Sequence, residues 1–412
     1  MDSRVMDADV IVAGAGPAGS AAALQLARAG RRVILCDRSE FPRDKTCGDG
    51  LIADSIGALT RLGLDREVAD RAYRTMNLRV LSPRGTEVSF ETTFWVLPRH
   101  VLDHVLFTRA VEAGAKFRHL TIEAPVLETA PADAGAGSRR PDPRVVGVAG
   151  RLPKSDTRVE LRAPLTLLAT GASAGILRKF DPDARSSASG YAIRTYAECP
   201  RRPLSELVIS LERDLLPGYA WAFPVPGGLI NVGIGAMRAR RLREDAVNLR
   251  LRLDDLVAGR SLLGRHLGPL RVTAPYQGAP LRTGLIGARL DRPGLAIIGE
   301  AAGTTYALTG EGIGKAMESG MLAADLAVAA GSSLADIGPQ YAERMRTQYG
   351  ARFQTYETAQ RWMRFPFIAD YIAGRANQSR WLHERLTGIL TERALPTHVF
   401  SARTFWRLLT QG

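Results

Sequence analysis

The sequence predicts an α/β protein in which a doubly wound, parallel-sheet domain is interrupted by a second domain on an antiparallel sheet and is followed by a helical C-terminal tail. Three observations predict this arrangement. Residues 9–37 have the pattern of a strand, a glycine turn, a helix and a second strand, which opens a parallel sheet. Residues 188–235 contain short strand-like runs separated by Pro-Gly and Gly-Gly turns. Residues 331–412 have helical spacing with interspersed aromatic residues.

The first part of the chain contains most of the expected α/β elements. A β-branched run ends in glycine and precedes a helix of small residues, which Gly30 ends. A stretch centred on SPRG predicts a hairpin, and the Ala-, Pro- and Gly-rich residues 129–143 predict a surface loop. The expected strands are 9–13, 31–37, the hairpin 77–90, 116–121 and 165–171, and the expected helices are 18–29 and 100–113.

In the later part of the sequence the predicted pattern changes twice, from alternating strands and helices to consecutive strands and back. Strands are expected near 190–197, 206–212, 219–224 and 229–235, and the parallel style returns at 294–330 with a strand, a loop and a long helix. The predicted domain limits are 1–75, 98–180 and 272–330 for the first domain, 76–97 and 181–271 for the second, and 331–412 for the tail.

Composition narrows the class of partner. Of the 412 residues, 45% are hydrophobic and 24% charged, as in ordinary globular proteins, and the net charge is +13. This charge favours an anionic partner such as a phosphorylated ligand or a membrane surface. The basic residues are scattered and mostly arginine, which codon usage explains, so we expect no nucleic-acid binding. Cys36, Cys47 and Cys199 have no paired spacing, which predicts neither a disulfide nor a metal site.

Targeting signals are not evident. Residues 1–7 lack an apolar segment, and no uninterrupted apolar run reaches the roughly 18 residues of a membrane span, so we expect a cytoplasmic protein. Residues 361–375 mix apolar, aromatic and arginine residues, and are expected either to contact a membrane surface or to pack as a helix on the second domain. His100, His104 and His119 are distant in sequence from the glycine-rich loops and are expected to be structural.

The glycine turn after the first strand predicts dinucleotide binding. It has the form GxGxxG, in which successive glycines permit a tight turn, close approach of a pyrophosphate, and close packing of helix on strand. The helix N-terminus adds free N–H groups and a partial positive charge. Asp37 ends the next strand, where a carboxylate can hold a ribose hydroxyl. The residues expected to bind the cofactor here are Gly14, Ala15, Gly16, Pro17, Ala18, Gly19, Asp37 and Arg38.

A second glycine-rich loop lies near the other end of the same domain. A strand ends at Gly299 and Glu300, and Gly310, Gly312 and Gly314 then open a helix whose N–H groups can face an anion or an electron-rich ring. Two such loops in one domain predict one long ligand bound in an extended form. FAD meets this requirement and a mononucleotide does not. The first domain is therefore predicted to be a Rossmann-like FAD-binding domain.

These motifs together resemble the geranylgeranyl reductase family of FAD-dependent oxidoreductases, within the group that shares the aromatic-hydroxylase FAD fold. The resemblance spans residues 9 to about 325. The FPRDKTCGDGL segment and the YxWxFP pattern point to the reductase branch. The segments that carry the resemblance are GAGPAGSAAA (14–23), FPRDKTCGDGL (41–51), PRHVLDHVL (98–106), GYAWAFPVPGGLINVGIG (218–235) and GEAAGTTYALTGEGIGKAMESG (299–320).

The resemblance also implies roles for particular residues. Arg99 would contact the pyrophosphate, and Glu300 would reach a ribityl hydroxyl. Flat aromatic side chains would give an isoprenoid tunnel an apolar wall. The residues concerned are Cys47, Gly48 and Asp49 beside the flavin ring, Gly310, Gly312, Ile313 and Gly314 under its pyrimidine edge, and Tyr219, Trp221 and Phe223 along the tunnel.

Two positions depart from the family pattern. Where similar flavoproteins carry Asp-Gly and Gly-Asp, this chain has Thr170-Gly171 and Gly299-Glu300. Glu300 keeps a carboxylate on a longer side chain. Thr170 lacks the carboxylate that makes a contact in the family. The glycine turns that define FAD binding are intact.

The segment 41–51 is charged, glycine-rich and without an amphipathic period. Cys47 is the first candidate for a proton donor, with a purely positional role beside the flavin as the alternative. Its basic neighbours Arg43 and Lys45 predict a lowered thiol pKa. The same two residues are expected either to hold a substrate diphosphate or to lie in a solvated loop.

The predicted activity is reduction of isolated C=C bonds in an isoprenoid chain, by hydride transfer from flavin N5 plus protonation. The substrate would be a prenylated small molecule or lipid. The electron donor stays open between NAD(P)H, a ferredoxin and a quinol. Two alternatives remain: a flavin-dependent monooxygenase or halogenase of a biosynthetic pathway, and an electron-transfer flavoprotein that serves a partner or a quinone.

Overall fold

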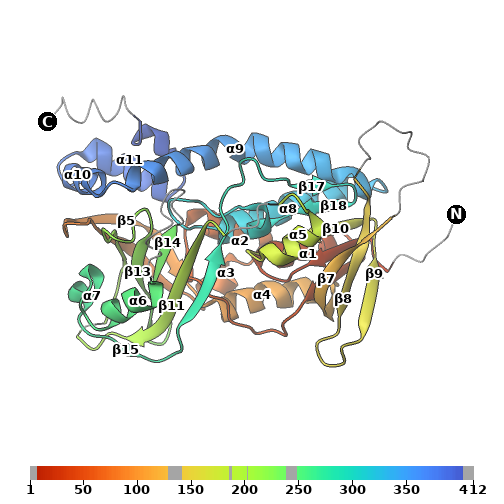
Figure 1. Cartoon of the computed structure of the whole chain (residues 1–412), viewed down its shortest axis with the longest axis horizontal. Coiled ribbons are helices and arrows are strands. Elements are labelled where there is room, and N and C mark those ends of the chain that lie inside the picture. The colour runs from red at the N-terminus through yellow and green to blue at the C-terminus, as the bar shows by residue number, and fades with distance from the viewer. Residues whose placement is uncertain (1–6, 129–141, 185–187, 202, 238–247, 402–412) are drawn as a thin grey trace.

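The computed structural model describes residues 7–128, 142–184, 188–201, 203–237 and 248–401 (Figure 1). Most of the loop predicted at 129–143 and the end of the predicted tail lie outside the described residues. Within them, the predicted α/β architecture is confirmed.

The first layer is a six-stranded, mainly parallel sheet with β1 (Val10–Ala13) at its centre. All four residues of β1 are buried, as expected for a central parallel strand that other elements cover on both faces. The edge strand β17 is antiparallel to its neighbour. The strand order is β17 (Asp291–Arg292), β18 (Leu295–Ile297), β10 (Leu165–Leu168), β1, β2 (Val33–Asp37) and β6 (Lys116–His119).

Helices pack closely against this sheet because small residues line their contacts. α1 (Pro17–Arg28) packs between α8 (Ile313–Ala329) and α4 (Arg99–Glu112). A Cβ on Gly320 of α8 would lie 2.2 Å from the carbonyl oxygen of Ala18 in α1, so only glycine permits this approach. The tight contact holds the start of α1 against the middle of α8, and a Cβ on Gly299 would likewise lie 2.7 Å from the Ala18 side chain, so the first glycine turn lies close to the start of the second glycine-rich loop.

The second layer is a nine-stranded sheet, antiparallel except where β4 pairs with β12 in parallel. The sequence indicated the hairpin and the later strands separately. It did not indicate that Leu78–Leu81 would join Leu207–Ser210 into one sheet. The members are β3 (Gly50–Leu51), β4 (Tyr73–Leu81), β5 (Glu87–Val96), β11 (Gly190–Glu198), β12 (Leu207–Ser210), β13 (Tyr219–Pro224), β14 (Ile230–Met237), β15 (Arg271–Val272) and β16 (Gln277–Leu281). β3 and β16 belong to this sheet although the predicted limits place them in the first domain.

Several smaller elements complete the molecule. A three-stranded antiparallel sheet packs against the central strands β10, β1 and β2 of the first layer, and short helices cover the second layer. These elements were not predicted. They are β7 (Thr121–Leu127), β8 (Val145–Arg151), β9 (Arg158–Arg162), α2 (Ala53–Leu62), α3 (Asp65–Ala69), α5 (Ala174–Phe180), α6 (Leu249–Val257), α7 (Leu262–Leu267), and the 3₁₀ turns Gly299–Ala302, Leu334–Asp336 and Pro396–His398.

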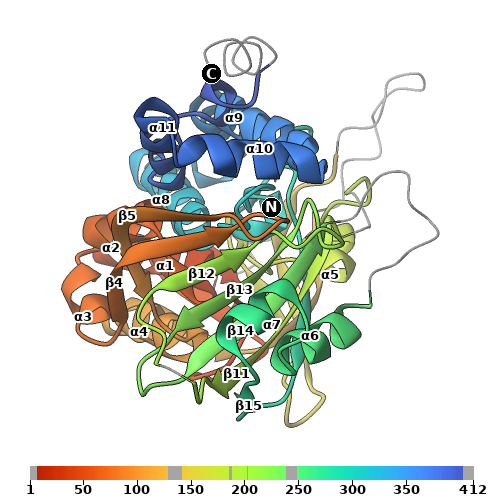
Figure 2. The same ribbon diagram turned by 90° about the vertical axis from the view of Figure 1, so that its left-hand side faces the viewer.

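The C-terminal region is helical, as predicted. α9 (Ile337–Met363) runs above both sheets in Figure 1, and Figure 2 shows α10 (Pro366–Ala376) and α11 (Arg380–Leu390) above β5. One hydrophobic core extends from the parallel sheet to these helices. A smaller core lies between the nine-stranded sheet and α6 and α7. Among the described residues, no helix combines the length and apolar character needed to cross a membrane.

Candidate active site

A cavity of roughly 640 Å³ lies between the two large sheets and continues to the C-terminal helices. Its wall starts at the carboxyl ends of β1, β2 and β10, the edge where open α/β sheets bind ligands. Nearly all residues that the sequence singled out line this wall. The exceptions are Ala15, Gly19, Gly299 and Gly314.

Three of these exceptions are glycines at points of close packing. A Cβ on Gly19 would lie 1.8 Å from the Gly14 carbonyl oxygen, and one on Gly299 would lie 2.7 Å from the Ala18 side chain. A Cβ on Gly314 would lie 2.4 Å from the Asp54 carboxylate. These glycines therefore permit the packing that shapes the site, and any direct contact with a cofactor stays a prediction.

The first glycine turn fits the phosphates of FAD. Gly14 has φ +115°, and a Cβ there would lie 2.3 Å from the Ala169 carbonyl oxygen. A Cβ on Gly16 would meet only the Arg43 guanidinium, at 3.6 Å, so this residue leaves open space in front of the backbone. The N-terminus of α1 has no side-chain cap, which leaves its N–H groups free for an anion.

The carboxylate of Asp37 holds this turn in shape. One oxygen accepts a hydrogen bond from the Ala15 N–H at 2.8 Å, and the other accepts from the Ser39 N–H at 2.9 Å. Both bonds orient the side chain at the cavity wall. Its predicted contact with a ribose hydroxyl would use the remaining acceptor capacity of these oxygens.

Asp103, which the sequence analysis did not select, organises two arginines at the cavity. Its carboxylate accepts bonds from Arg99 Nε at 2.7 Å and Nη2 at 2.8 Å. It also lies 3.1 Å from Arg43 Nη1. The structure thus places Arg43 beside Gly16 and the phosphate-binding turn, where a pyrophosphate contact is open to it in addition to the predicted substrate contact.

The loop after β2 is held by Asp49. This residue is fully buried with φ +64°. Its Oδ2 accepts from the Tyr196 hydroxyl at 2.6 Å and from Asn231 Nδ2 at 2.7 Å. Burial raises the pKa of Asp49 to about 6, against the lowering effect of these hydrogen bonds. Asn231 Nδ2 also donates to the Cys47 carbonyl oxygen at 2.8 Å, so the network fixes the loop against the second sheet.

The prediction of a lowered thiol pKa for Cys47 is wrong. Burial raises this pKa and outweighs the positive charges of Arg99 and Lys45, because desolvation penalises the thiolate. The Cys47 side chain lines the cavity and is half-buried. The thiol is therefore neutral near pH 7.

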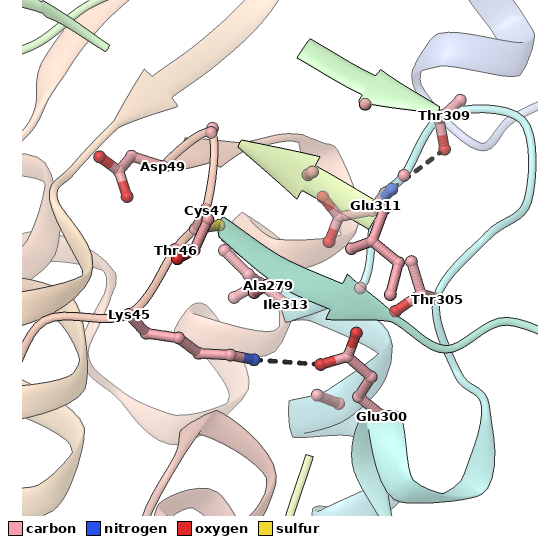
Figure 3. A pocket seen from close by; sticks show the side chains of 18 of the residues that line it. Lys45, Thr46, Cys47, Asp49, Ala279, Glu300, Thr305, Thr309, Glu311 and Ile313 are labelled. Atoms are coloured by element: carbon pink, nitrogen blue, oxygen red, sulfur yellow. Dashed lines mark hydrogen bonds and ion pairs between the residues drawn. The ribbon is translucent and has the colours of Figure 1, made fainter. Parts of the chain in front are cut away.

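An ion pair joins the segment 41–51 to the second glycine-rich loop. Lys45 Nζ lies 3.0 Å from Glu300 Oε2. Figure 3 marks this pair with a dashed line. Glu300 Oε1 accepts a hydrogen bond from the Arg282 backbone N–H at 3.3 Å. Thr170, where the family has a carboxylate, has a buried Oγ1 without a hydrogen-bond partner among the described residues. A buried hydroxyl of this kind at a cavity wall suits a polar group of a bound ligand.

The predicted aromatic residues lie along one strand of the cavity wall. Tyr219, Trp221 and Phe223 alternate along β13, so the period of two directs their side chains to the same face. Trp221 Nε1 donates to Asn231 Oδ1 at 3.0 Å, and the Tyr219 hydroxyl donates to the Thr309 carbonyl oxygen. The polar edges of these rings are therefore satisfied within the protein, and their remaining surface is apolar.

Beyond these rings the cavity is apolar and ends under the C-terminal helices. No sequence pattern indicated that these helices form part of the wall, because their contribution depends on how the tail folds back over β5. The apolar lining residues of this part are Leu78, Val80, Val88, Phe90, Phe94, Leu207, Ile209, Met363, Ala369, Ile372, Ala373, Leu386, Ile389, Leu390 and Phe400.

Glu311 was also missed, although it lies inside the GEGIG motif. It lines the cavity, is 8% exposed, and accepts hydrogen bonds from Ser55 Oγ at 3.0 Å and the Gly314 N–H at 2.9 Å. Burial, followed by the nearby Asp54 charge, raises the pKa of Glu311 to about 8. Figure 3 shows it across the same space from Cys47. Among the residues that the structure describes, no histidine lines the cavity and no cluster is suited to a metal ion.

Sequence comparison gives the family. The family model described as "FAD binding domain" matches residues 7–131. A menaquinone reductase of Mycolicibacterium smegmatis is 34% identical over 79% of this chain and 77% of its own. Digeranylgeranylglycerophospholipid reductase 1 of Methanopyrus kandleri is 30% identical over 86% of this chain and 89% of its own.

The chain belongs to the geranylgeranyl reductase family of FAD-dependent oxidoreductases. Solved structures support the same fold. A geranylgeranyl bacteriochlorophyll reductase-like protein of Thermoplasma acidophilum superposes with a TM-score of 0.75 at 20% identity, covering 98% of this chain and 96% of that one. The flavin-dependent brominase Bmp2 gives a TM-score of 0.71 at 18% identity, covering 98% of each chain. The fold is thus shared with a flavin-dependent brominase, and the reaction has to be argued from the cavity.

Proposed function

We propose that this FAD-dependent reductase hydrogenates isolated C=C bonds in the isoprenoid chain of a lipid or a prenylated quinone. The observation that carries the proposal is the long apolar branch of the cavity, which leaves the flavin side past the β13 aromatic residues and ends under α10 and α11. A polyprenyl chain matches such a wall because burial of its hydrocarbon surface drives binding. The names of the two relatives, one acting on menaquinone and one on a digeranylgeranylglycerophospholipid, support the same substrate class.

Bound FAD, once reduced, supplies a hydride at N5. The residues of this protein would hold the cofactor and form the wall of the substrate cavity. Gly14, Gly16 and the N-terminus of α1 would hold the pyrophosphate, and Asp37 the adenosine ribose. The Cys47–Asp49 loop, fixed by Tyr196 and Asn231, would form the wall beside the reacting double bond.

The cavity wall would mainly position the alkene and exclude water. An isolated alkene is a poor hydride acceptor, so orientation and a proton supplied at the right carbon are both needed. Tyr219 and Trp221 form a rigid surface, with ring centroids 6.1 Å apart and planes at 67°. Their hydrogen bonds fix the rings, which limits the entropy lost when a chain lies against them.

The test is anaerobic incubation of the dithionite-reduced holoprotein with geranylgeranyl lipids and with menaquinone, followed by mass spectrometry. A gain of two hydrogens per reduced bond supports the proposal. An absence of reduced prenyl product would refute it. Substrate oxygenation or halogenation in air would then favour the monooxygenase alternative, and electron delivery only to a partner protein or a quinone ring would favour the electron-transfer alternative.

A blocked variant sharpens this test. Ala373, buried in α10, lines the far end of the cavity, so Ala373→Phe should shorten the space for the chain while leaving the FAD turn intact. Ala351 is exposed on α9, outside the cavity, and Ala351→Phe is the matched control. We expect the first variant to lose activity on long prenyl chains and keep bound FAD, and the second to retain both.

We also propose that the protein contacts a membrane surface beside this end of the cavity. Phe365 and Phe367 are 47% and 60% exposed, with ring centroids 5.9 Å apart, and Arg361 and Arg364 are exposed nearby. Exposed aromatic residues next to arginines suit an anionic bilayer interface. Phe367→Glu should reduce co-sedimentation with phosphatidylglycerol vesicles. Leu251→Glu on α6, also 60% exposed, is the control and should not reduce it.

A further inference from the structure

A connected series of polar side chains, most of them charged, extends away from the cavity behind Glu311. Its members come from segments far apart in sequence, and together they connect the N-terminus of α2 with α8, α9 and the end of α11. Their side chains are buried or half-buried. They are Asp54, Ser55, Glu311, Lys315, Glu318, Arg352 and Glu392.

The cavity end of this series is Glu311. The described residues donate two hydrogen bonds to its carboxyl, one from Ser55 Oγ and one from the Gly314 N–H. Oε1 accepts both of them. The residue lines the cavity, so Oε2 is left for the cavity contents. Cys47 and Tyr219 line the same cavity, so Glu311 shares this space with both side chains.

This series of polar side chains is continuous from Glu311 toward the surface. Ser55 Oγ lies 3.4 Å from Asp54 Oδ1, and Asp54 Oδ2 lies 3.4 Å from Lys315 Nζ. The ammonium of Lys315 lies 2.8 Å from Glu392 Oε2 and 2.8 Å from Glu318 Oε2.

At its outer end the series reaches solvent. Glu392 Oε2 lies 3.2 Å from Arg352 Nη1, and the Arg352 side chain is 29% exposed. Polar groups thus connect the cavity wall with the exterior.

Stability does not explain this cluster. Asp54 Oδ2 and Glu392 Oε1 are buried without a hydrogen-bond partner among the described residues. Buried charges of this kind are often less stabilising than apolar residues of the same volume. Each unsatisfied oxygen adds a desolvation penalty. The arrangement is thus costly for folding, which points to a role in function.

The cluster also keeps Glu311 protonated near neutral pH. Burial and the Asp54 charge together raise the pKa of Glu311 to about 8, and burial raises the pKa of Glu392 to about 7. A neutral carboxylic acid at the wall of an apolar cavity is a general acid ready to donate.

We propose that Glu311 is the catalytic acid that protonates the alkene, and that Ser55, Asp54 and the Lys315–Glu392 pair return a proton to it from solvent. The inference rests on the proposed alkene reduction. One alkene carbon receives a hydride, with two electrons, from reduced FAD. The other carbon receives the proton of Glu311 as the π bond breaks, and the O–H electron pair stays on the carboxylate. That carboxylate is then reprotonated through the Ser55 hydroxyl.

Glu311 is a better donor than Cys47. Burial raises the pKa of the Cys47 thiol above its ordinary value of 9.0, whereas Glu311 has a pKa of about 8. The carboxylic acid is therefore the stronger acid of the two. It also has a polar route for reprotonation, whereas Cys47 lies on the opposite side of the space, in the loop that Asp49 fixes (Figure 3).

The experiment compares the wild-type holoenzyme with Glu311→Gln, Glu311→Asp and Ser55→Ala in single-turnover alkene reduction. The matched control is Glu343→Gln, because Glu343 is exposed on α9, outside the cavity. Loss of the general acid should slow Glu311→Gln by about 10²- to 10⁴-fold at unchanged FAD content. Glu311→Asp should recover part of the rate. Ser55→Ala should slow repeated turnover more than the first turnover, since it interrupts reprotonation.

A second readout does not require turnover. Infrared difference spectra of the oxidised holoprotein, titrated with base, should show the C=O band of a protonated carboxyl that is lost as the pH rises through about 8. We expect this band to be absent in Glu311→Gln and present in Glu343→Gln. The wild-type single-turnover rate should fall over the same pH range, because the acid form is the active one.

The outcomes separate the two proposals. If the wild type reduces prenyl chains and Glu311→Gln does so at the same rate, the assignment of Glu311 is refuted while the function stands. A missing carboxyl band in the wild type at pH 7 refutes it as well. If the wild type reduces no prenyl substrate, the proposed function fails, and the assignment fails with it.

Discussion

Replacement of Lys315 by methionine tests the energetics of the buried cluster. Lys315 Nζ is nearly fully enclosed and lies 2.8 Å from Glu318, 2.8 Å from Glu392 and 3.4 Å from Asp54. Lys315→Met keeps most of the side-chain volume and removes the only cation that the structure places in contact with the Asp54 carboxylate among the described residues. The carboxylates then remain buried without their counter-charge.

The size of the effect follows from these distances. Each 2.8 Å pair is worth about 6 kcal/mol at an effective dielectric constant of about 20, before desolvation is subtracted. Breaking a buried pair by removing one partner costs a net of about 3–5 kcal/mol. We therefore expect the free energy of unfolding to fall by about 3–5 kcal/mol near pH 8.

The loss should grow with pH. The folded-state pKa of Glu392 is raised to about 7 in the wild type, so below that pH the folded protein binds a proton that the unfolded chain has released. Without the ammonium this pKa rises further. Above pH 7 the Glu392 carboxyl ionises in the folded wild type, whereas the folded variant must keep it protonated. The loss of unfolding free energy therefore grows by about 1.4 kcal/mol per pH unit for each such carboxyl.

The assay is urea unfolding in excess FAD between pH 6 and pH 9, followed by circular dichroism and flavin fluorescence. Arg380→Met is the control, because its pair with Glu384 is solvent-exposed and should leave the midpoint unchanged. A triple variant, Lys315→Met with Asp54→Leu and Glu392→Met, should regain much of the loss. A destabilisation below about 1 kcal/mol, or one independent of pH, would show that the cluster is solvated and would refute the reasoning.

Three further predictions concern the cavity wall. Gly16→Ala should leave the fold intact, because φ −75° suits alanine and the added methyl group meets only Arg43. The same methyl group should weaken FAD binding by about 10- to 100-fold, measured by fluorescence titration. Unchanged affinity would place the pyrophosphate elsewhere. Cys47→Ala should retain most alkene-reduction activity, and a loss as large as that of Glu311→Gln would restore the thiol as donor. Asp49→Ala should lower stability by about 2–4 kcal/mol in denaturant unfolding, since it leaves the Tyr196 hydroxyl and one of the two N–H groups of the Asn231 amide without an acceptor. A loss below about 1 kcal/mol would mean that water replaces the carboxylate.

The local parts of the fold were predictable because they depend on short-range pattern. The opening strand, turn and helix are set by a buried β-branched run, glycines and small residues within about 30 positions, and the structure confirms each element. β13 was predicted at its observed limits for the same reason. The join between β4 and β12 was not predictable, since a pairing across more than 120 residues leaves no local signal.

The candidate site likewise has features that the sequence predicts and features that depend on the tertiary structure. The sequence alone determined the glycine turns, Asp37 and the alternating aromatic residues, because φ requirements and a period of two are properties of adjacent residues. Only the tertiary structure decided the chemistry of the wall. The pKa of Cys47 rises instead of falling, and Glu311 becomes a neutral acid, because desolvation is produced by segments that fold over them from distant parts of the chain. The same folding turns the C-terminal helices, which the sequence presented only as a tail, into the end of the cavity.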